Sequence, residues 1–266
     1  MKIKTFRRTA QIATLIAIFV IPLLNVYELY FIKGTFYSMD IGDAAIADPL
    51  AVFQSMLASG KVNAYMIGSL IIPIALMMLL GRVWCSWFCP YYLAAEFVAW
   101  FRKKLRLKSV KPEYTDGVHL KQSKIRYIFL FVGLVVMSII GVPILNLISA
   151  PGVISSQALV LVKFGYVTFE IAFISILIIL EFFYFRWWCR FFCPTGTFLS
   201  FFRIKRGMTV RKVTDQCSNC LSCVRSCPMM INPMTMGENS NCNNCGDCVD
   251  ACPDNRKKDT LKFTFR

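Results

Sequence analysis

Histidine is nearly absent from this chain of 266 residues, in which His119 is the single one. A transmembrane cytochrome of the bis-imidazole type needs axial histidines inside its helices, so that class of protein is excluded. The chain also has no G-x-G-x-x-G or Walker sequence, and nothing therefore points to a nucleotide site. Acidic residues are few, 15 against 30 Lys and Arg, and the cations lie beside apolar segments, which argues against nucleic acid as a partner.

Hydrophobic residues make up 56% of the chain although its net charge is +15. Apolar and charged residues are segregated along the sequence, as in an integral membrane protein with basic loops. About twenty helical residues, at ~1.5 Å each, cross a hydrocarbon core of ~30 Å. The apolar segments predict four transmembrane helices, at about 10–32, 63–83, 125–147 and 164–185.

The positions of the cations predict the orientation. Of the thirty Lys and Arg, only Lys33, Lys61 and Lys163 fall in the expected outer connections, residues 33–62 and 148–163. Because cytoplasmic loops carry the excess of Lys and Arg, both termini are expected in the cytoplasm. The sequence thus predicts a multi-pass protein of the bacterial inner membrane.

Two similar cysteine runs, CSNCLSCVRSCP and CNNCGDCVDACP, lie near the C-terminus. Each reads C-x2-C-x2-C-x3-C-P, the run of bacterial 4Fe-4S proteins, and the pair predicts two such clusters. Structural zinc sites or a disulfide knot fit the duplicated four-cysteine run poorly. In two-cluster ferredoxins the fourth cysteine of each run binds the other cluster. The predicted ligands are Cys217, Cys220, Cys223 and Cys252 for one cluster, and Cys242, Cys245, Cys248 and Cys227 for the second.

An internal repeat accounts for the other four cysteines. Segments 82–90 and 186–194 share Arg, Trp, Cys, Phe, Cys and Pro at the same positions, and spans one and three share a Pro followed by an Asn three residues later. A duplicated hairpin with the same in-out direction implies a pseudo-twofold axis along the membrane normal. Equivalent positions should then meet between the two halves.

That axis would bring the cysteines of both C-x3-C-P motifs together at the cytoplasmic boundary. Four thiolates there could bind a third cluster, form redox-active disulfides or bind another metal. The alternative is that they are small apolar residues at helix ends. We expect a redox or ligand role, next to a cluster or quinone, for Cys85, Cys89, Cys189 and Cys193.

A few polar residues in the predicted spans are further candidates. Glu170 is a possible proton acceptor, whereas Glu28 and Glu181 lie near helix ends and are expected to reach water. Asn25 and Asn146 could hydrogen-bond a quinone carbonyl or satisfy backbone groups freed by the preceding Pro. Four motif tryptophans are expected to be interfacial, with the wall of a quinone or cluster pocket as the alternative: Trp84, Trp87, Trp187 and Trp188.

The predicted fold is mainly α and has two domains. Residues 1–212 would form a four-transmembrane-helix bundle of two repeated hairpins. Residues 213–266 would form a cytoplasmic, two-cluster, ferredoxin-like domain with little regular structure, because eight ligating cysteines leave small room for a core.

Taken together, the four spans, the two C-x3-C-P motifs and the paired cysteine runs resemble the NapH family. Its members are ferredoxin-type membrane subunits of quinol dehydrogenases, and NosR-type and MauN-type membrane iron-sulfur proteins are similar. The resemblance covers essentially the whole chain. Ser86 departs from the pattern, since many relatives carry Gly after the first motif cysteine.

The resemblance implies oxidation of membrane quinol in anaerobic respiration, with electrons passing to a periplasmic reductase of the nitrate or nitrous oxide type. It also implies a periplasmic, NapG-like iron-sulfur subunit and a c-type cytochrome as partners. Cluster potentials span about −700 to +450 mV, so spacing cannot set the direction of flow. The alternatives are a non-catalytic relay or maturation factor that supplies cytoplasmic electrons to a metalloenzyme, and a redox sensor.

Overall fold

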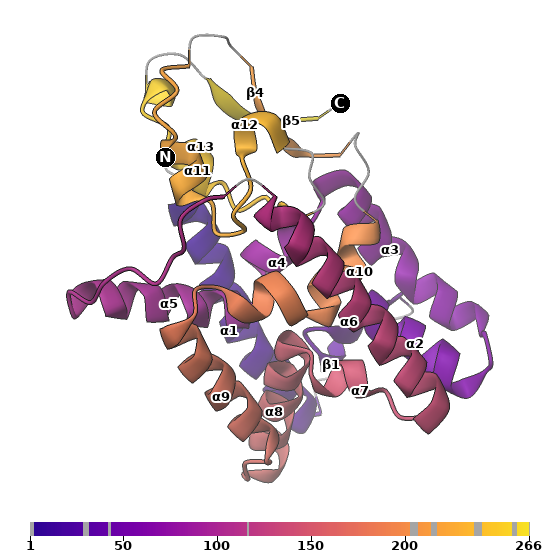
Figure 1. The fold of residues 1–266 in the computed structure, drawn as a ribbon. Helices are drawn as coiled ribbons and strands as arrows, with labels where there is room; N and C mark the ends of the chain where they lie inside the picture. Colours follow the sequence, from indigo (N-terminus) through magenta and orange to yellow (C-terminus); the bar gives the residue numbers. More distant parts are fainter. Residues whose placement is uncertain are drawn as a thin grey trace.

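The computed structural model describes residues 3–28, 32–41, 44–115, 117–202, 207–213, 217–236, 241–256 and 260–265. Most of the chain is helical, and two small antiparallel sheets complete it (Figure 1). The first copy of the repeat contains α1 (Ile3–Val26), β1 (Ile32–Thr35), β2 (Ser38–Ile41), β3 (Ala44–Ala47), α2 (Pro49–Ser59), α3 (Ala64–Leu80), α4 (Val83–Trp87) and α5 (Pro90–Lys104). The second contains α6 (Val118–Ile140), α7 (Ile144–Leu147), α8 (Ala150–Phe164), α9 (Glu170–Phe183), the π-helix η1 (Trp188–Phe192) and α10 (Pro194–Phe201).

The two copies interlock. Helix α1 of the first copy packs on α8 of the second, and α2 packs on α6 and α10. Helix α5 lies against α8 and α9. Each copy therefore completes the core of the other, as expected when neither half can bury its apolar face alone.

The predicted outer connections are not simple loops. Strands β1, β2 and β3 form a sheet in that order, and helices α2 and α8 follow in equivalent places in the two copies. Proline lies in the first turn of both helices, at Pro49 and Pro151, where its fixed φ favours helix initiation. Both helices end at a left-handed glycine, Gly60 and Gly165. The membrane part is thus more elaborate than a four-helix bundle.

The bounds of three predicted spans need correction. The predicted 10–32 corresponds to α1 at 3–26, the predicted 125–147 to α6 at 118–140, and the predicted 164–185 to α9 at 170–183. Residues 29–31 of the first span lie outside the described residues. Apolar residues continue past each helix, so hydropathy alone could not locate the ends, which Gly141 sets for α6 through a left-handed C-cap.

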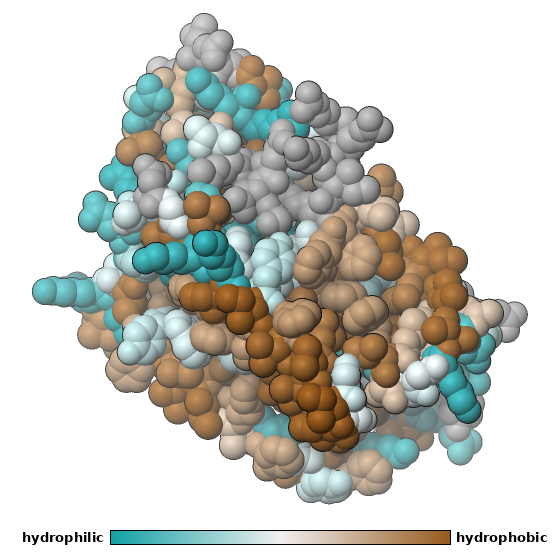
Figure 2. All heavy atoms as spheres, turned by 45° about the vertical axis from the view of Figure 1, so that its right-hand side comes forward, coloured by the Kyte–Doolittle hydropathy of each residue, from teal (hydrophilic) through white to brown (hydrophobic). Residues whose placement is uncertain are grey.

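Two helices, α1 and α6, are long and apolar enough to cross a membrane, and α2, α3 and α8 are shorter apolar helices. Apolar side chains such as Ile71, Ile128, Phe131 and Ile139 are exposed, Ile139 to 79%. Figure 2 shows a broad brown, apolar band on one face, with hydrophilic side chains gathered toward the end that carries the C-terminal elements. A contiguous apolar surface of this kind indicates a membrane protein.

The C-terminal segment lies on the N-terminal end of α1 (Figure 1). It contains β4 (Thr209–Lys212), α11 (Ser222–Ser226), α12 (Pro233–Met236), α13 (Asp247–Asp250), the 3-10 helix η2 (Asp254–Arg256) and β5 (Leu261–Thr264). The carboxylate of Asp250 accepts the Ile3 and Lys4 N–H groups at 3.1 and 2.8 Å. Since these are unsatisfied donors of the first helical turn, the C-terminal segment caps α1 from outside that helix.

Candidate functional site

Both C-terminal cysteine runs wind through the same backbone conformations. Asn219 and Leu221 in the first run have φ of 52° and 55°, and the equivalent Asn244 and Gly246 have φ of 52° and 78°. Left-handed residues at the third and fifth positions turn the loop around a common centre and aim successive N–H groups toward it. A short helix, α11 or α13, then carries the third cysteine of each run.

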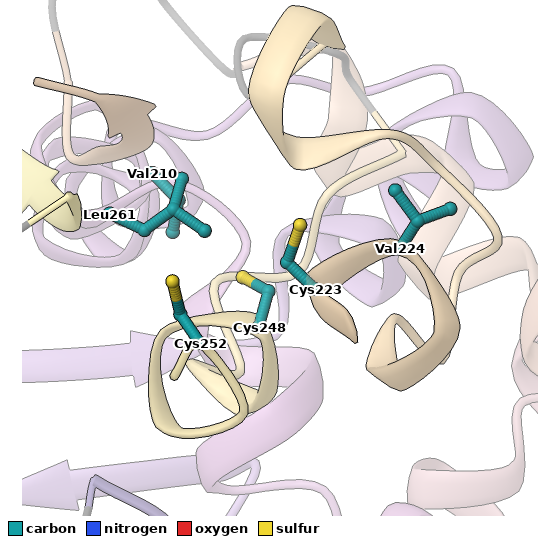
Figure 3. Packing of buried hydrophobic residues seen from close by; sticks show 6 residues of the cluster. All are labelled: Val210, Cys223, Val224, Cys248, Cys252 and Leu261. Atoms are coloured by element: carbon teal, nitrogen blue, oxygen red, sulfur yellow. The ribbon is translucent and has the colours of Figure 1, made fainter. Parts of the chain in front are cut away.

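Packing groups these cysteines across the two runs. Cys223, Cys248 and Cys252 are buried in one core with Val210, Val224 and Leu261, and Figure 3 shows their sulfur atoms close to one another. Cys223 interacts electrostatically with Cys252 and Cys217. Cys227 packs with Cys242 and interacts electrostatically with Cys242 and Cys245. The fourth cysteine of each run therefore lies with the other run, while the assignment of ligands to clusters stays a prediction.

The thiols differ in exposure. Burial raises the pKa of Cys227 to about 11 and that of Cys245 and Cys248 well above the usual range. Cys220 is exposed, and its hydrogen bonding with Ser222 lowers its pKa. Buried thiols of this kind need nearby positive charge to ionise, which a bound iron-sulfur core supplies.

The four repeat cysteines also meet. Cys85 lies in α4 and Cys189 in η1, whereas Cys89 and Cys193 are the residues that precede α5 and α10. The second cysteine of each pair thus follows the helix end instead of lying one turn along the same helix, because Pro90 and Pro194 start new helices. Electrostatic interactions join Cys89 to Cys85 and Cys193, Cys193 to Cys85, and Cys189 to Cys89 and Cys193.

Buried guanidinium groups border the four repeat thiols. Arg82 Nη2 is 4.0 Å from Cys85 Sγ. A Cβ on Gly196 would meet Arg82 Nη2 at 3.0 Å, Cys193 Sγ at 3.4 Å and Arg126 Nη2 at 3.6 Å, so these groups surround one point. Arg126 is 2% exposed and makes no ion pair among the described residues. Since a buried cation needs a nearby anion, the site suits four thiolates around an iron-sulfur core, because the four thiolates give the whole assembly a net negative charge.

The cysteine side chains are not arranged to bind a single metal ion. In the described part of the chain, no three His, Cys, Asp or Glu side chains are close enough to hold one ion. A cubane spreads its thiolates over a larger body than one ion does.

Hydrogen bonds join the first C-x3-C-P motif to the second cysteine run. Ser86 Oγ donates to the Asn243 carbonyl at 2.6 Å, and Trp87 Nε1 donates to the Asn244 carbonyl at 3.2 Å. Asn244 Nδ2 donates to the Leu80 carbonyl at 2.8 Å. Ser86, the departure from the family pattern, is fully buried at this junction, so its hydroxyl has a structural role there.

Replacing Ser86 with alanine should loosen this junction. The buried Asn243 carbonyl would lose its donor, at a cost of about 1–3 kcal/mol. We expect a lower midpoint for thermal loss of cluster absorbance, with the iron content of the folded protein unchanged. The control is Ser138→Ala, because the exposed Ser138 donates to the Leu134 carbonyl within its own helix. Equal midpoints for the two variants would contradict the assigned role.

The remaining sequence candidates lie elsewhere. Glu170 begins α9 and accepts from Ser156 Oγ at 3.0 Å, apart from the cysteines. Glu28 is exposed, but the expectation that Glu181 reaches water is wrong, because it is buried against Tyr91 and the Arg186 N–H. Asn25 Nδ2 donates to the Ile21 and Gly34 carbonyls, in line with the backbone-satisfying alternative, and the Asn146 N–H donates to Gln54.

The motif tryptophans are half-buried or buried and make contacts within the protein. Trp188 is buried, Trp84 stacks on Phe36, and Trp187 packs against Phe192. Trp87 makes the junction hydrogen bond described above. Trp187 and Trp188 pack in one core with Cys89, Cys189 and Cys193, in line with the alternative that motif tryptophans wall a cluster pocket.

Several residues at the site were not singled out from the sequence. Arg7 is one of the cations of the predicted cytoplasmic side, yet it is fully buried and donates to the Cys245 carbonyl at 2.7 Å. No sequence pattern marked Arg126 as a site residue. A sequence pattern did mark Arg82 and Arg186, since both stand at the same position of the repeated motif.

Known proteins are similar to this chain in the segments that contain these motifs. A family model described as a 4Fe-4S binding domain matches residues 62–108 and 166–211, so each match contains one C-x3-C-P motif. An uncharacterised protein of Methanocaldococcus jannaschii is 31% identical over 180 residues, which cover 68% of this chain and 72% of that protein. No solved structure matches the chain.

Two named relatives are similar over more of the chain. The methylamine utilization ferredoxin-type protein MauN of Paracoccus denitrificans is 27% identical over 242 residues, 88% of this chain and 79% of that protein. The ferredoxin-type protein NapH of Escherichia coli is 27% identical over 206 residues, 76% of this chain and 67% of that protein. With its cysteine runs and repeated motifs, the chain belongs to the NapH-like family of ferredoxin-type proteins and is an iron-sulfur protein of electron transfer.

Proposed function

We propose that this protein is a membrane electron-transfer subunit that oxidises quinol and passes the electrons on through its iron-sulfur sites. The observation that carries the proposal is the hydrogen-bonded junction between Ser86 and Trp87 of the first motif and Asn243 and Asn244 of the second run. This junction supports a position of the repeat cysteines beside a loop that would bind a cluster. Electrons that enter at the repeat cysteines thus have a short route to the C-terminal clusters.

Twelve cysteines would hold three clusters. The crossed grouping of the C-terminal thiols supports one cluster on Cys217, Cys220, Cys223 and Cys252, and a second on Cys242, Cys245, Cys248 and Cys227. The buried arginines beside the repeat thiols support a third cluster on Cys85, Cys89, Cys189 and Cys193. When bound, such clusters accept and release single electrons.

The protein's own residues would set the conditions for these cofactors. Arg82 and Arg126 offset the negative charge that four thiolates bring into a buried site. Trp84 and Phe88, with ring centroids 5.2 Å apart, would put apolar surface beside the cluster of the first motif. Low water access and nearby cations both adjust a cluster potential.

The relatives named NapH extend the proposal to topology and partners. We place both termini and the C-terminal domain in the cytoplasm, because the Lys and Arg lie on that side. The electron acceptor would be a periplasmic iron-sulfur subunit with a c-type cytochrome, leading to a nitrate or nitrous oxide type reductase. A partner subunit or a diffusing quinone must carry the electrons across the bilayer.

Iron analysis and EPR under anaerobic conditions test the cofactor content. The full chain in detergent should hold about twelve irons, at four per cubane, and Cys85→Ala with Cys189→Ala should lower this to about eight. A wild-type content of about eight would remove the third cluster from the proposal. Reduction of the clusters by a short-chain menaquinol would support quinol oxidation, and no reduction by any quinol would contradict it.

The exposure of Cys220 favours one alternative, an electron relay or maturation factor. A cluster with a ligand at the surface can take electrons from a soluble cytoplasmic donor. Clusters that stay oxidised with menaquinol but are reduced by a low-potential ferredoxin would support this alternative.

A further inference from the structure

A cavity of about 330 Å³ lies beside the first C-x3-C-P motif. Its walls come from the β1–β2 turn, helix α3 and the motif itself, and its main rings are Phe36, Tyr37, Trp84 and Phe88. Phe36 stacks on Trp84 with ring centroids 5.8 Å apart. Pockets that take small apolar ligands have this size and this mainly apolar, aromatic lining.

One carboxyl group faces this apolar space. Asp48, the residue that precedes α2, lines the cavity, and its Oδ1 accepts the Leu50 N–H at 3.0 Å. Among the described residues its side chain has no other hydrogen-bond partner, which leaves the second carboxylate oxygen for a ligand. Burial raises the pKa of Asp48 to about 6, so the group can take up and release a proton near neutral pH.

Tyr37 connects the carboxyl group to the cysteines. Its hydroxyl donates to the Phe88 carbonyl at 2.9 Å, one residue before Cys89, and it interacts electrostatically with Cys89, Asp48 and Cys85. Tyr37 and Asp48 are the titratable residues among those that line the cavity. A ligand in this space would thus lie between a proton acceptor and the repeat thiols.

The second copy of the repeat differs at the equivalent place. Ser149, not an acid, precedes helix α8 there, and its hydroxyl is hydrogen-bonded to Thr195 Oγ1 at 2.7 Å. In the described residues, the sheet of β1, β2 and β3 has no counterpart between α6 and α8. The departure from repeat symmetry therefore coincides with the cavity, as expected of a ligand site present once per chain.

The cavity also adjoins the apolar surface. Ile72 and Leu76 of α3 line it, yet they are 43% and 47% exposed. A ligand dissolved in the membrane could therefore reach the cavity past α3. These two residues distinguish the site from a pocket for a polar metabolite.

We propose that this cavity binds the ring of a membrane quinol and that Asp48 accepts its hydroxyl protons. The inference rests on the proposed quinol oxidation and gives it a location. Oxidation of one quinol to the quinone breaks two O–H bonds and releases two protons and two electrons. An oxidised iron-sulfur cluster held by the repeat cysteines would supply the acceptor for the two electrons, one at a time. Asp48 takes each proton in turn and releases it to solvent before the next.

Two substitutions separate binding from proton transfer. Leu76→Trp should fill the cavity and weaken binding of a short-chain menaquinone, measured by tryptophan quenching, by roughly tenfold. Asp48→Asn keeps the size and the Oδ1 acceptor for the Leu50 N–H. We expect it to bind menaquinone normally but to slow cluster reduction by menaquinol about 100-fold. The matched control for Leu76→Trp is Leu79→Trp, since the exposed Leu79 does not line the cavity.

The pH dependence gives an independent readout. Asp48 must be ionised to accept a proton, so the rate of cluster reduction by menaquinol in the wild type should rise with pH through about 6 and level off above it. Asp48→Asn should lose this rise, while full reduction by dithionite remains. A wild-type rate and pH profile in Asp48→Asn, or wild-type binding in Leu76→Trp, would overturn the inference and leave quinol oxidation standing. Wild-type clusters that no quinol reduces would overturn both.

Discussion

Replacing Cys252 with alanine is expected to abolish the same EPR signal as replacing Cys217, although 34 residues separate the two cysteines in the sequence. Both interact electrostatically with Cys223, and Cys252 shares a buried core with it. Removing either would leave one cubane with three ligands, and we expect iron to fall by about four per chain. The measurement is iron analysis with anaerobic EPR of the reduced, full-length protein.

The second run provides the matched comparison. Cys227→Ala should resemble Cys242→Ala, because Cys227 packs with Cys242 of the second run. If Cys252→Ala instead lost the same signal as Cys245→Ala, the clusters would follow the linear order of the runs. The crossed assignment would then be wrong.

Arg7→Met is expected to detach the C-terminal domain from the membrane part. Arg7 is fully buried, donates to the Cys245 carbonyl at 2.7 Å, and pairs with Glu96 and, at 3.1 Å, with Asp247. In the variant, the carboxylates of Glu96 and Asp247 would lose this partner and lie near the apolar methionine side chain. Breaking a buried ion pair from one side costs about 3–5 kcal/mol. We expect faster cleavage in limited proteolysis between the domains and a lower urea midpoint for cluster loss.

Arg8→Met is the control for charge. Arg8 is the next residue, its side chain is 47% exposed, and its closest approach to Glu96 is 3.8 Å. Exposed pairs of this kind contribute about 0–1 kcal/mol, so the control should behave like the wild type. Equal losses in the two variants would mean that net charge, not the buried network, holds the domain.

The spacing of the cysteines was enough to predict that this protein is an iron-sulfur protein. Two C-x2-C-x2-C-x3-C-P runs point to iron-sulfur chemistry without any tertiary information, because three of the four ligands of one cubane are close together in sequence. The family comparisons confirm a ferredoxin-type, NapH-like protein. The internal repeat could also be detected from the sequence, since Arg82 and Arg186 stand at equivalent positions of its two motifs.

Other features could not be read from the sequence. The predicted outer connections, 33–62 and 148–163, contain helix α2 and, except for its last residue, helix α8, and both helices pack against the other copy. Asp48 was not singled out from the sequence, although an Asp before a Pro is a typical helix start. The hydropathy of a segment measures its preference for an apolar medium. It does not show whether a short apolar segment folds as a helix against another part of the protein.

The sequence by itself determined the chemistry of this protein: twelve cysteines in metal-binding spacing, an internal repeat and apolar segments with basic flanks. Only the tertiary structure decided which groups meet. It brought Cys85 and Cys193 to the same place, put Arg126 beside them, and set Tyr37 and Asp48 around a cavity at the first motif. Ligand spacing is a local property of the chain, whereas the partners of a buried charge come from segments far apart in sequence that only packing brings together.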